Sequence, residues 1–400
     1  MPEAVIVATG RTPIGRAMKG SLVSCRPDDL AALAIREVVA KLPQLDPSLI
    51  EDVILGCGQP AGEAGYNLGR VAAILAGFDV PGVTVNRYCS SSLQTIRMAA
   101  HAIKAGEGDI FVAAGVETVS RFMHGASDTG PHNPLFAEGE ARTVARTPAV
   151  TDPWTSGAGL PDVYISMGQT AENVAEYEQV GRQEMDEFAA LSQQRAVASQ
   201  ENGFFEREII PVTLEDGTVV TKDDGPRAGT TVEGLANLKP VFREGGTVTA
   251  GNACPLNDGA AAVVVMSETK AAELGITPLA RIVASGVSAL NPEIMGLGPI
   301  GACRQALGRA GLTIDAIDLV EINEAFAAQV IPSAKHLGID WEKLNVRGGA
   351  IALGHPFGMT GARIMTTLIN ALQTDDKQFG MESMCVGGGQ GMAMIIERLS

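Results

Sequence analysis

The sequence predicts an α/β fold made of two similar halves, and three observations support this prediction. Runs such as Ala4 to Ala8 (AVIVA) and Asp109 to Gly115 (DIFVAAG) are almost continuously apolar, as is typical of strands in a parallel-type sheet covered by helices. These strands alternate with segments of helical periodicity. The same order and spacing of landmarks also recurs late in the chain. We therefore expect two helix-covered halves of similar construction.

Composition and charge exclude several classes of protein. The chain has 400 residues, which is enough for two or three domains and a large core. A net charge of −16 argues against nucleic acid and against an anionic membrane surface as partners. No apolar run reaches transmembrane length, and the N-terminus lacks a signal-peptide pattern. The six cysteines include no CxxC pair, so we expect no metal site, no disulfide framework and a cytoplasmic setting.

The expected elements follow the alternation of strands and helices along the chain. Early strands are expected at Ala4 to Ala8, Val53 to Leu55, Val83 to Val85 (the end of a buried strand), and Asp109 to Gly115. The helices between them are expected at Pro27 to Ala40, Asn67 to Leu75 and Leu93 to Lys104, with Gly106 as the last C-cap. Late in the chain, a helix at Cys303 to Ala310 precedes a strand at Leu319 and Val320.

The segment from about Arg121 to Thr249 is predicted to be an inserted, loop-rich subdomain. Proline, glycine and threonine are frequent here and strand-like runs are few. Two helices are expected between Gly168 and Gln200, with a break near Gly181. Loops of this length often form lids or ligand clamps. Strand-like alternation returns at Ala260 to Met266.

Cys89 lies between the expected strand ending at Val85 and the expected helix beginning near Leu93. A cysteine at a helix N-terminus feels the positive end of the helix dipole, which lowers its pKa and raises its thiolate fraction. The serines at 90–92 are N-cap candidates. These features make Cys89 a candidate nucleophile. The alternative is a small buried residue at a tight turn.

An internal repeat places a histidine at the position equivalent to Cys89. In each half a helix leads through an aspartate into a strand, and Asp52 and Asp318 occupy these equivalent positions. Cys89 follows Asp52 by 37 positions, and His355 follows Asp318 by 37 positions. Two halves related by a pseudo-twofold axis would bring the two helix N-termini together. His355 is therefore a candidate base that takes the thiol proton, and a structural hydrogen-bonding role is its alternative.

Two further segments contain side chains suited to catalysis. Cys385, in MCVGGGQGM, lies at the end of the last expected buried strand and could form a redox pair with a nearby thiol or transfer a carbon-bound proton, with a core residue as the alternative. Asn323, in EINEAFAAQ, could cap a helix or could hold a water or an oxyanion. Its neighbour Glu324 is interpreted as an ordinary first-turn carboxylate.

Four segments together resemble the thiolase family: VNRYCSSSLQ, INEAFA, GGAIALGHPFGMTGAR and MCVGGGQGMA. They occur in the family's order, and the resemblance covers nearly the whole chain. It implies an α/β, thiolase-like fold in which two similar βαβαβαββ halves form a five-layer αβαβα core. By this resemblance, residues 1–270 form the first half, with an inserted CoA-binding loop subdomain at about 121–250. Residues 271–400 form the second half.

The resemblance also implies roles for the candidate residues. Cys89 matches the nucleophile that carries the acyl group, and His355 matches the base that activates it. Cys385 matches the acid/base that handles the α-carbon proton. Asn323 matches the residue that fixes a water which, with His355, forms one oxyanion hole. The backbone N–H groups of Cys89 and Gly387 match the second hole.

Binding of coenzyme A is implied by the same resemblance. Arg227 matches a residue that contacts the nucleotide end of CoA, with a solvated loop charge as its alternative, and Met167 and Cys254 match positions at the CoA site. Cys254-Pro255 departs from the family, which usually has a serine that bonds to the pantetheine arm, and a thiol is a poorer partner. Arg347 is a second departure, near the predicted catalytic loop.

The resemblance implies an acyltransferase, an acetyl-CoA C-acyltransferase or 3-ketoacyl-CoA thiolase of the degradative type. Ser166 stands where the synthetic type usually has histidine. The implied reaction is thiolytic cleavage of a 3-ketoacyl-CoA by CoA through an acyl-cysteine, as in fatty-acid β-oxidation. CoA is a substrate, no tightly bound cofactor is implied, and a homodimer or homotetramer is expected. The alternatives are an acetoacetyl-CoA-forming acetyl-CoA C-acetyltransferase and an inactive, thiolase-like lipid-CoA binding protein.

Overall fold

A computed structural model describes residues 2–122, 130–147 and 152–400. Its main sheet follows the order β10-β11-β12-β9-β1-β8-β5-β3-β4, with β2 paired to β8. The strands of the first half are β1 (Ala4–Arg11), β2 (Gly15–Arg16), β3 (Asp52–Gly56), β4 (Gly82–Val85), β5 (Ile110–Thr118) and β8 (Asn257–Ser267). Those of the second half are β9 (Ala280–Ala289), β10 (Leu319–Ile322), β11 (Phe379–Val386) and β12 (Gln390–Arg398).

Among the described strands, the two groups are joined only where β1 pairs with β9, through Val5 with Arg281 and Ile6 with Ala280. The expected parallel arrangement holds for β3 with β4 and β5, and for β10 with β11. The other pairings in this sheet are antiparallel, so the sheet is mixed. A short connection through Gly387–Gly389 explains the antiparallel pairing of β11 with β12, because only a tight hairpin can join adjacent strands this closely.

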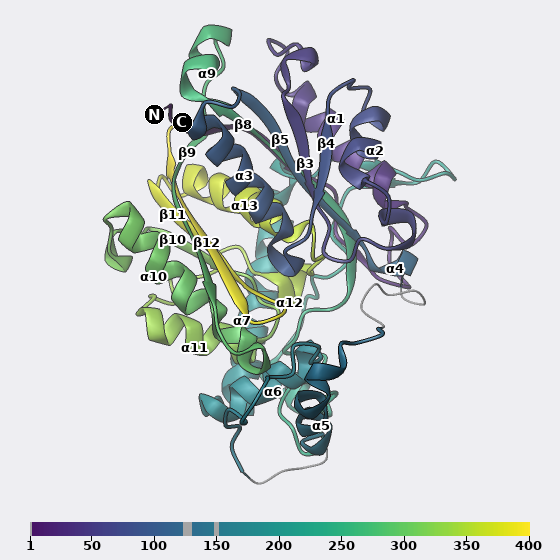
Figure 1. The fold of residues 1–400 in the computed structure, drawn as a ribbon, viewed down its shortest axis with the longest axis vertical. Coiled ribbons are helices and arrows are strands. Elements are labelled where there is room, and N and C mark those ends of the chain that lie inside the picture. Colours follow the sequence, from purple (N-terminus) through teal and green to yellow (C-terminus); the bar gives the residue numbers. More distant parts are fainter. Residues whose placement is uncertain (1, 123–129, 148–151) are drawn as a thin grey trace.

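Helices cover both faces of each group of strands, which gives five layers (Figure 1). Helices α3 (Ser91–Ala105) and α13 (Thr360–Thr374) lie between the two groups and share one buried core with both. Helices α1 (Pro27–Ala40) and α2 (Leu68–Leu75) cover the outer face of the first half. Helices α10 (Gly298–Ala310) and α11 (Ala327–Leu337) cover the outer face of the second. The central pair of helices therefore carries the N-termini that the repeat predicted to meet.

The segment between β5 and β8 is mostly helix and loop, as expected. Its helices are α4 (Val119–Phe122), α5 (Ala137–Ala145), α6 (Met167–Tyr177), α7 (Arg182–Glu201) and α8 (Val232–Ala236). The strands in its described part are the short hairpin β6 (Val212–Thr213) and β7 (Val219–Val220). In Figure 1, α5 and α6 lie beyond one end of the layered body. The predicted division at residue 270 falls within α9 (Glu268–Leu274), which connects β8 to β9, and it stays a prediction.

Several expected bounds are confirmed and others change. The helix predicted at Pro27 to Ala40 has these bounds, and Gly106 ends α3 in the left-handed conformation with φ 79°. The helix predicted from Cys303 begins earlier, at Gly298, because Pro299 is well tolerated in a first turn. The strand at Val83 to Val85 was expected to be buried, but it belongs to the edge strand β4, which is half-buried along its length. Among the described residues, no helix is both long and apolar enough to span a membrane.

Candidate active site

Cys89 lies in a sharp turn, Tyr88–Ser90, that joins β4 to α3. Tyr88 has φ 42°, a strained left-handed conformation, and its N–H donates to Oδ1 of Asn86 at 2.8 Å. The expectation that a serine side chain caps α3 is wrong. Ser91 Oγ instead accepts from the N–H of Arg87 at 2.9 Å and donates to the carbonyl of Tyr88 at 2.7 Å. This bonding holds the turn and directs Cys89 into a cavity of about 360 Å³.

Burial dominates the ionisation of Cys89. Loss of solvation raises the pKa of its thiol to about 11, although the backbone N–H groups of Gly387 and of Cys89 itself act to lower it. The expected lowering of this pKa by the helix N-terminus is therefore wrong for the unliganded protein. The two N–H groups that act on the thiol, those of Cys89 and Gly387, are the two expected oxyanion donors, and they lie at the sulfur atom.

His355 is buried and its imidazole is held at both nitrogens. Nδ1 lies 2.6 Å from Oγ1 of Thr360, which itself donates to the carbonyl of Pro356 at 2.9 Å. A hydroxyl has one proton, so Thr360 accepts from Nδ1–H, and Nε2 retains its lone pair. Burial, and secondarily the charge of Arg363, lower the pKa of His355 to about 3. The side chain is thus a neutral imidazole that can accept a proton at Nε2.

Asn323 lies 3.3 Å from this nitrogen, measured from its Nδ2 to Nε2 of His355. It does not cap a helix, because α11 begins four residues later, at Ala327. Its Oδ1 is buried and has no partner among the described residues. Glu324 does not lie in a first helical turn either. It is buried and accepts from Ser192 Oγ at 2.6 Å and from Asn345 Nδ2 at 2.9 Å.

Two further thiols lie near Cys89. Burial raises the pKa of Cys385 well above its ordinary value, and nearby charge on Cys89 and Cys254 adds to this rise. The pKa of Cys254 is raised by burial and then by Cys89 and Glu324. Cys254 is fixed by its N–H, which donates to the carbonyl of Ala325 at 3.0 Å. The tertiary structure thus gathers Cys89, Cys254 and Cys385, which are far apart in sequence.

The three residues predicted to contact CoA line two separate cavities. Arg227 and Cys254 line a groove of about 350 Å³, whose walls include Leu235, Leu238 and Phe242. Arg227 lies on an exposed loop, and its N–H donates to Oε1 of Gln193 at 2.9 Å. Met167 is not in this groove and instead lines the cavity that contains Cys89.

Glu117 is a buried carboxylate that joins the loops around the site. It accepts from the N–H groups of Gly58 and Gly358, each at 2.8 Å, and from that of Gln59 at 3.2 Å. Gly58 and Gln59 follow β3, whereas Gly358 belongs to the loop that begins at His355. Burial raises the pKa of Glu117 to about 7. This residue was missed from the sequence, where an acidic side chain within an otherwise apolar strand was its only signal.

The sequence matches the thiolase N-terminal domain family over residues 4–269 and the thiolase C-terminal domain family over residues 276–398. The chain belongs to the thiolase family. It is 44% identical to the beta-ketoadipyl-CoA thiolase of Acinetobacter baylyi, with both chains covered in full. It is 42% identical to the 3-ketoacyl-CoA thiolase of Bacillus subtilis, over 99% of this chain and all of the relative.

Two solved structures share the thiolase fold with this chain. The dimeric peroxisomal thiolase of Saccharomyces cerevisiae superimposes with a TM-score of 0.89 at 37% identity, covering 100% of this chain and 98% of the other. The acetyl-CoA acetyltransferase of Bacillus anthracis gives a TM-score of 0.86 at 40% identity, covering 100% and 99%. The chain is therefore a thiolase-family acyltransferase with the predicted thiolase-like α/β fold.

In this thiolase, Arg87 and Gln390 connect the loops on either side of Cys89. Arg87 Nη1 donates to Oε1 of Gln390 at 2.6 Å, and Gln390 Nε2 donates to the carbonyl of Gly387 at 3.4 Å. This chain of contacts fixes the loop before Cys89 against the Gly387 loop.

Arg347, the second departure from the family pattern, forms an ion pair with Asp375 and lies over the ring of Phe204 at 4.7 Å. These contacts give the arginine a structural role. The described residues contain no cluster of three or more side chains suited to binding a metal.

Proposed function

We propose that this protein cleaves a 3-ketoacyl-CoA with CoA, giving acetyl-CoA and an acyl-CoA shortened by two carbons. The proposal rests on one observation above all: the buried thiol of Cys89 lies beside the N–H of Gly387, and the buried thiol of Cys385 is close enough for charge on Cys89 to raise its pKa. One sulfur can form a bond to a carbonyl carbon while the other supplies a proton to the departing carbon. A thioester intermediate divides carbon–carbon cleavage into two easier steps.

In the first step, the Cys89 sulfur attacks the 3-keto carbon and its proton passes to Nε2 of His355. The bond between C2 and C3 then breaks, and its electron pair forms the enolate of acetyl-CoA. Cys385 protonates that enolate at C2, and the acyl group stays on Cys89. In the second step, the Cys385 thiolate takes the proton of a free CoA thiol, and the CoA sulfur attacks the thioester. The bond from the acyl carbon to Cys89 breaks, the shortened acyl-CoA is released, and Cys89 recovers its proton from Nε2 of His355.

Oxyanion stabilisation is assigned to two sets of donors. The N–H groups of Cys89 and Gly387 act at the sulfur, where the thioester oxygen would develop charge. Asn323 is assigned to hold a water beside His355, because its buried Oδ1 is available to accept a hydrogen bond from one. The short distance between Asn323 and His355 supports the assignment of this water and His355 as the second set of oxyanion donors.

CoA is assigned to the groove that contains Arg227 and Cys254, as a substrate and not as a tightly bound cofactor. Arg227 would contact a phosphate of the nucleotide, since it is exposed at the groove and forms no ion pair with the described residues. Cys254 would lie beside the thiol end of pantetheine, close to Cys89. Met167 would contact the reacting end from the Cys89 cavity.

We infer that the acyl group is apolar. The described walls of the Cys89 cavity include Val119, Val163, Ile165, Leu256 and Phe357, and they contain no charged side chain. A carboxylate at the far end of the acyl chain would lose its water there without gaining a partner, which is costly. This argues against the ketoadipyl group named for the Acinetobacter relative, despite 44% identity.

The test is CoA-dependent cleavage of a series of 3-ketoacyl-CoAs of increasing length, together with 3-oxoadipyl-CoA. We expect kcat/KM to rise from acetoacetyl-CoA to medium chains and to be at least tenfold lower for 3-oxoadipyl-CoA than for a chain of equal length. Cys89→Ala should abolish all of these activities. Preference for 3-oxoadipyl-CoA would contradict the apolar assignment.

An acetyl-CoA C-acetyltransferase that forms acetoacetyl-CoA is the second candidate, because the chain resembles the Bacillus anthracis enzyme over its whole length. Activity confined to acetoacetyl-CoA in the same series would favour it. CoA binding without any acyl transfer to Cys89 would favour an inactive, lipid-CoA binding thiolase-like protein. Mass spectrometry of the protein after mixing with substrate separates these outcomes, because only an active enzyme gains an acyl group.

We propose a homodimer as the basic assembly. The support is the edge strand β4, whose outer backbone groups have no neighbouring strand among the described residues, and the likeness to a dimeric yeast thiolase. Light scattering coupled to size-exclusion chromatography would distinguish a dimer from a tetramer. The expected cytoplasmic setting stays a proposal, and it is supported by six cysteines that are all unpaired.

A further inference from the structure

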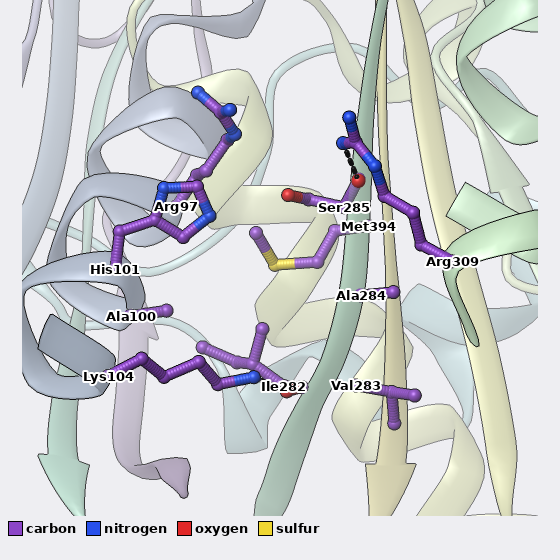
Figure 2. A pocket seen from close by; sticks show the side chains of 10 residues that line it. All are labelled: Arg97, Ala100, His101, Lys104, Ile282, Val283, Ala284, Ser285, Arg309 and Met394. Atoms are coloured by element: carbon purple, nitrogen blue, oxygen red, sulfur yellow. Dashed lines mark hydrogen bonds between the residues drawn. The ribbon is translucent and has the colours of Figure 1, made fainter. Parts of the chain in front are cut away.

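A second cavity, of about 300 Å³, lies between the central helix α3 and the second half of the molecule. Figure 2 shows Arg97, His101 and Lys104 on one side of it and Arg309 on the other. The first three residues follow one another along a face of α3, whereas Arg309 is in the last turn of α10. The floor is apolar and includes residues of β9 and β12. None of its lining residues lines the cavity of Cys89.

The four basic side chains have no carboxylate to balance them. No aspartate or glutamate lines the cavity, and none of the four forms an ion pair with any described residue. Arg309 Nη1 donates to the carbonyl of Ser285 at 2.7 Å, and Lys104 Nζ reaches the carbonyl of Ile282 at 3.5 Å. Nε of Arg97 is buried and has no hydrogen-bond partner among the described residues. The other N–H groups of Arg309 and Lys104 therefore remain available as donors.

Three of these side chains, Arg97, Lys104 and Arg309, carry positive charge that acts on the fourth, His101, and disfavours its protonation. Burial lowers the pKa of His101, and the positive charges of Arg97, Lys104 and Arg309 lower it further. The pKa of Arg97 is likewise lowered by burial and by Arg87 and Arg309. Such concentrated, uncompensated positive charge is unusual in a chain whose net charge is −16. An anion placed among these side chains would relieve their mutual repulsion.

We propose that this cavity is a binding site for a small multivalent oxyanion, such as the phosphoryl or carboxylate groups of a metabolite. Guanidinium groups on opposite walls can each donate two parallel hydrogen bonds to an oxyanion, and the lysine adds a point charge. The volume is within the range of small-molecule sites. A ligand there would connect α3 of the first half to β9 and α10 of the second, so its binding should stabilise the packing of the two halves.

The test is calorimetric and thermal titration of the intact, full-length protein with sodium pyrophosphate and, separately, with sodium citrate. Sodium chloride at equal ionic strength is the control for screening. We expect saturable binding of at least one oxyanion and an unfolding temperature that rises with its concentration. Tight binding of pyrophosphate alone would assign phosphoryl groups, and tight binding of citrate alone would assign carboxylates.

Variants locate the binding. Arg97→Gln and Arg309→Gln should each weaken it at least tenfold, and Lys104→Gln, a milder change on the same helix, should weaken it severalfold. Arg36→Gln, an exposed arginine of α1, is the matched control and should leave the affinity unchanged. Arg227→Gln should also leave it unchanged, which separates this site from the proposed CoA groove.

Three results would overturn the proposal. The first is an effect of oxyanions no larger than that of sodium chloride. The second is full affinity in both Arg97→Gln and Arg309→Gln, with circular dichroism showing that the variants are folded. The third is the absence of binding to the intact oligomer, which would indicate that carboxylates of a second copy already fill the cavity.

Discussion

Asn323 and His355 approach each other within 3.3 Å through Nδ2 of the amide and Nε2 of the imidazole. The contact joins the loop after β10 to the loop before α13, so it forms only when the second half is folded. Nε2 keeps a lone pair that faces Asn323, because Nδ1 carries the proton and donates it in a hydrogen bond to Oγ1 of Thr360 on the other side of the ring. Asn323 and Thr360 therefore fix one tautomer in one orientation.

Replacing Thr360 with valine should loosen this arrangement. We expect kcat to fall by about tenfold to a hundredfold, because the neutral imidazole would populate both tautomers and the wrong one has no base at Nε2. Thr360→Ser should restore most of the activity. Steady-state kinetics across pH 6 to 9 is the measurement, and equal losses in the valine and serine variants would contradict the tautomer argument.

Asn323→Ala should lower kcat more than it raises KM. The change should release the water that Asn323 holds, and losing one preorganised oxyanion donor typically costs about 10²–10³ in kcat, since the donor acts mainly when charge develops. Gln329→Ala is a structural control, because Gln329 Nε2 donates to the backbone carbonyl of Asn323, at 2.6 Å, and not to its side chain. If the two variants lost kcat equally, the amide of Asn323 would have no specific role.

The thiol of Cys89 should be largely protonated in the unliganded protein at neutral pH. Its pKa is about 11, so at any pH below that value the thiolate fraction increases about tenfold when the pH is raised by one unit. Alkylation by iodoacetamide, followed by peptide mass spectrometry at Cys89, should therefore accelerate tenfold per unit between pH 7 and 10. A rate that levels off below pH 8 would instead indicate a thiolate stabilised by the helix N-terminus.

Glu117 should make the protein less stable as pH rises. Its pKa is about 7 in the folded protein and 4.5 ordinarily. At a pH between these two values, the folded state therefore holds a proton that the unfolded state has released. The free energy of unfolding should fall across this window by roughly 3 kcal/mol from this residue. Urea titrations at pH 5 and pH 8 should show a smaller difference for Glu117→Gln than for the natural protein. An unchanged difference would mean that Glu117 is ionised throughout.

Gly115 is required by the close approach of β5 to the loop after His355. A Cβ at this position would lie 2.0 Å from the carbonyl oxygen of Gly358. Gly115→Ala should therefore destabilise the fold by about 1–3 kcal/mol and also lower activity by displacing that loop. Gly308→Ala in α10 is the matched control, because its Cβ would meet nothing within 4 Å and should stabilise the helix by roughly 0.5–1 kcal/mol. Chemical denaturation of both variants tests this pair.

Much of the fold could be predicted because local patterns agree with the final packing. The helix at Pro27 to Ala40 has the expected bounds, and the equal spacing from Asp52 to Cys89 and from Asp318 to His355 identified the paired helices α3 and α13. The parallel arrangement was only partly right, because a tight glycine hairpin reverses β12 against β11. The half-buried state of β4 could not be predicted, since a strand's place at a sheet edge depends on which strands pair.

The sequence by itself determined the family, the two-halved α/β architecture and the chemical types of the candidate residues, because motifs and hydrophobic periodicity are local properties of a chain. Only the tertiary structure decided the ionisation of Cys89, the place of Glu117 between two loops, and the gathering of Cys254 and Cys385 beside Cys89. Solvation and distance control these properties. Both depend on how distant segments pack, which no stretch of sequence specifies alone.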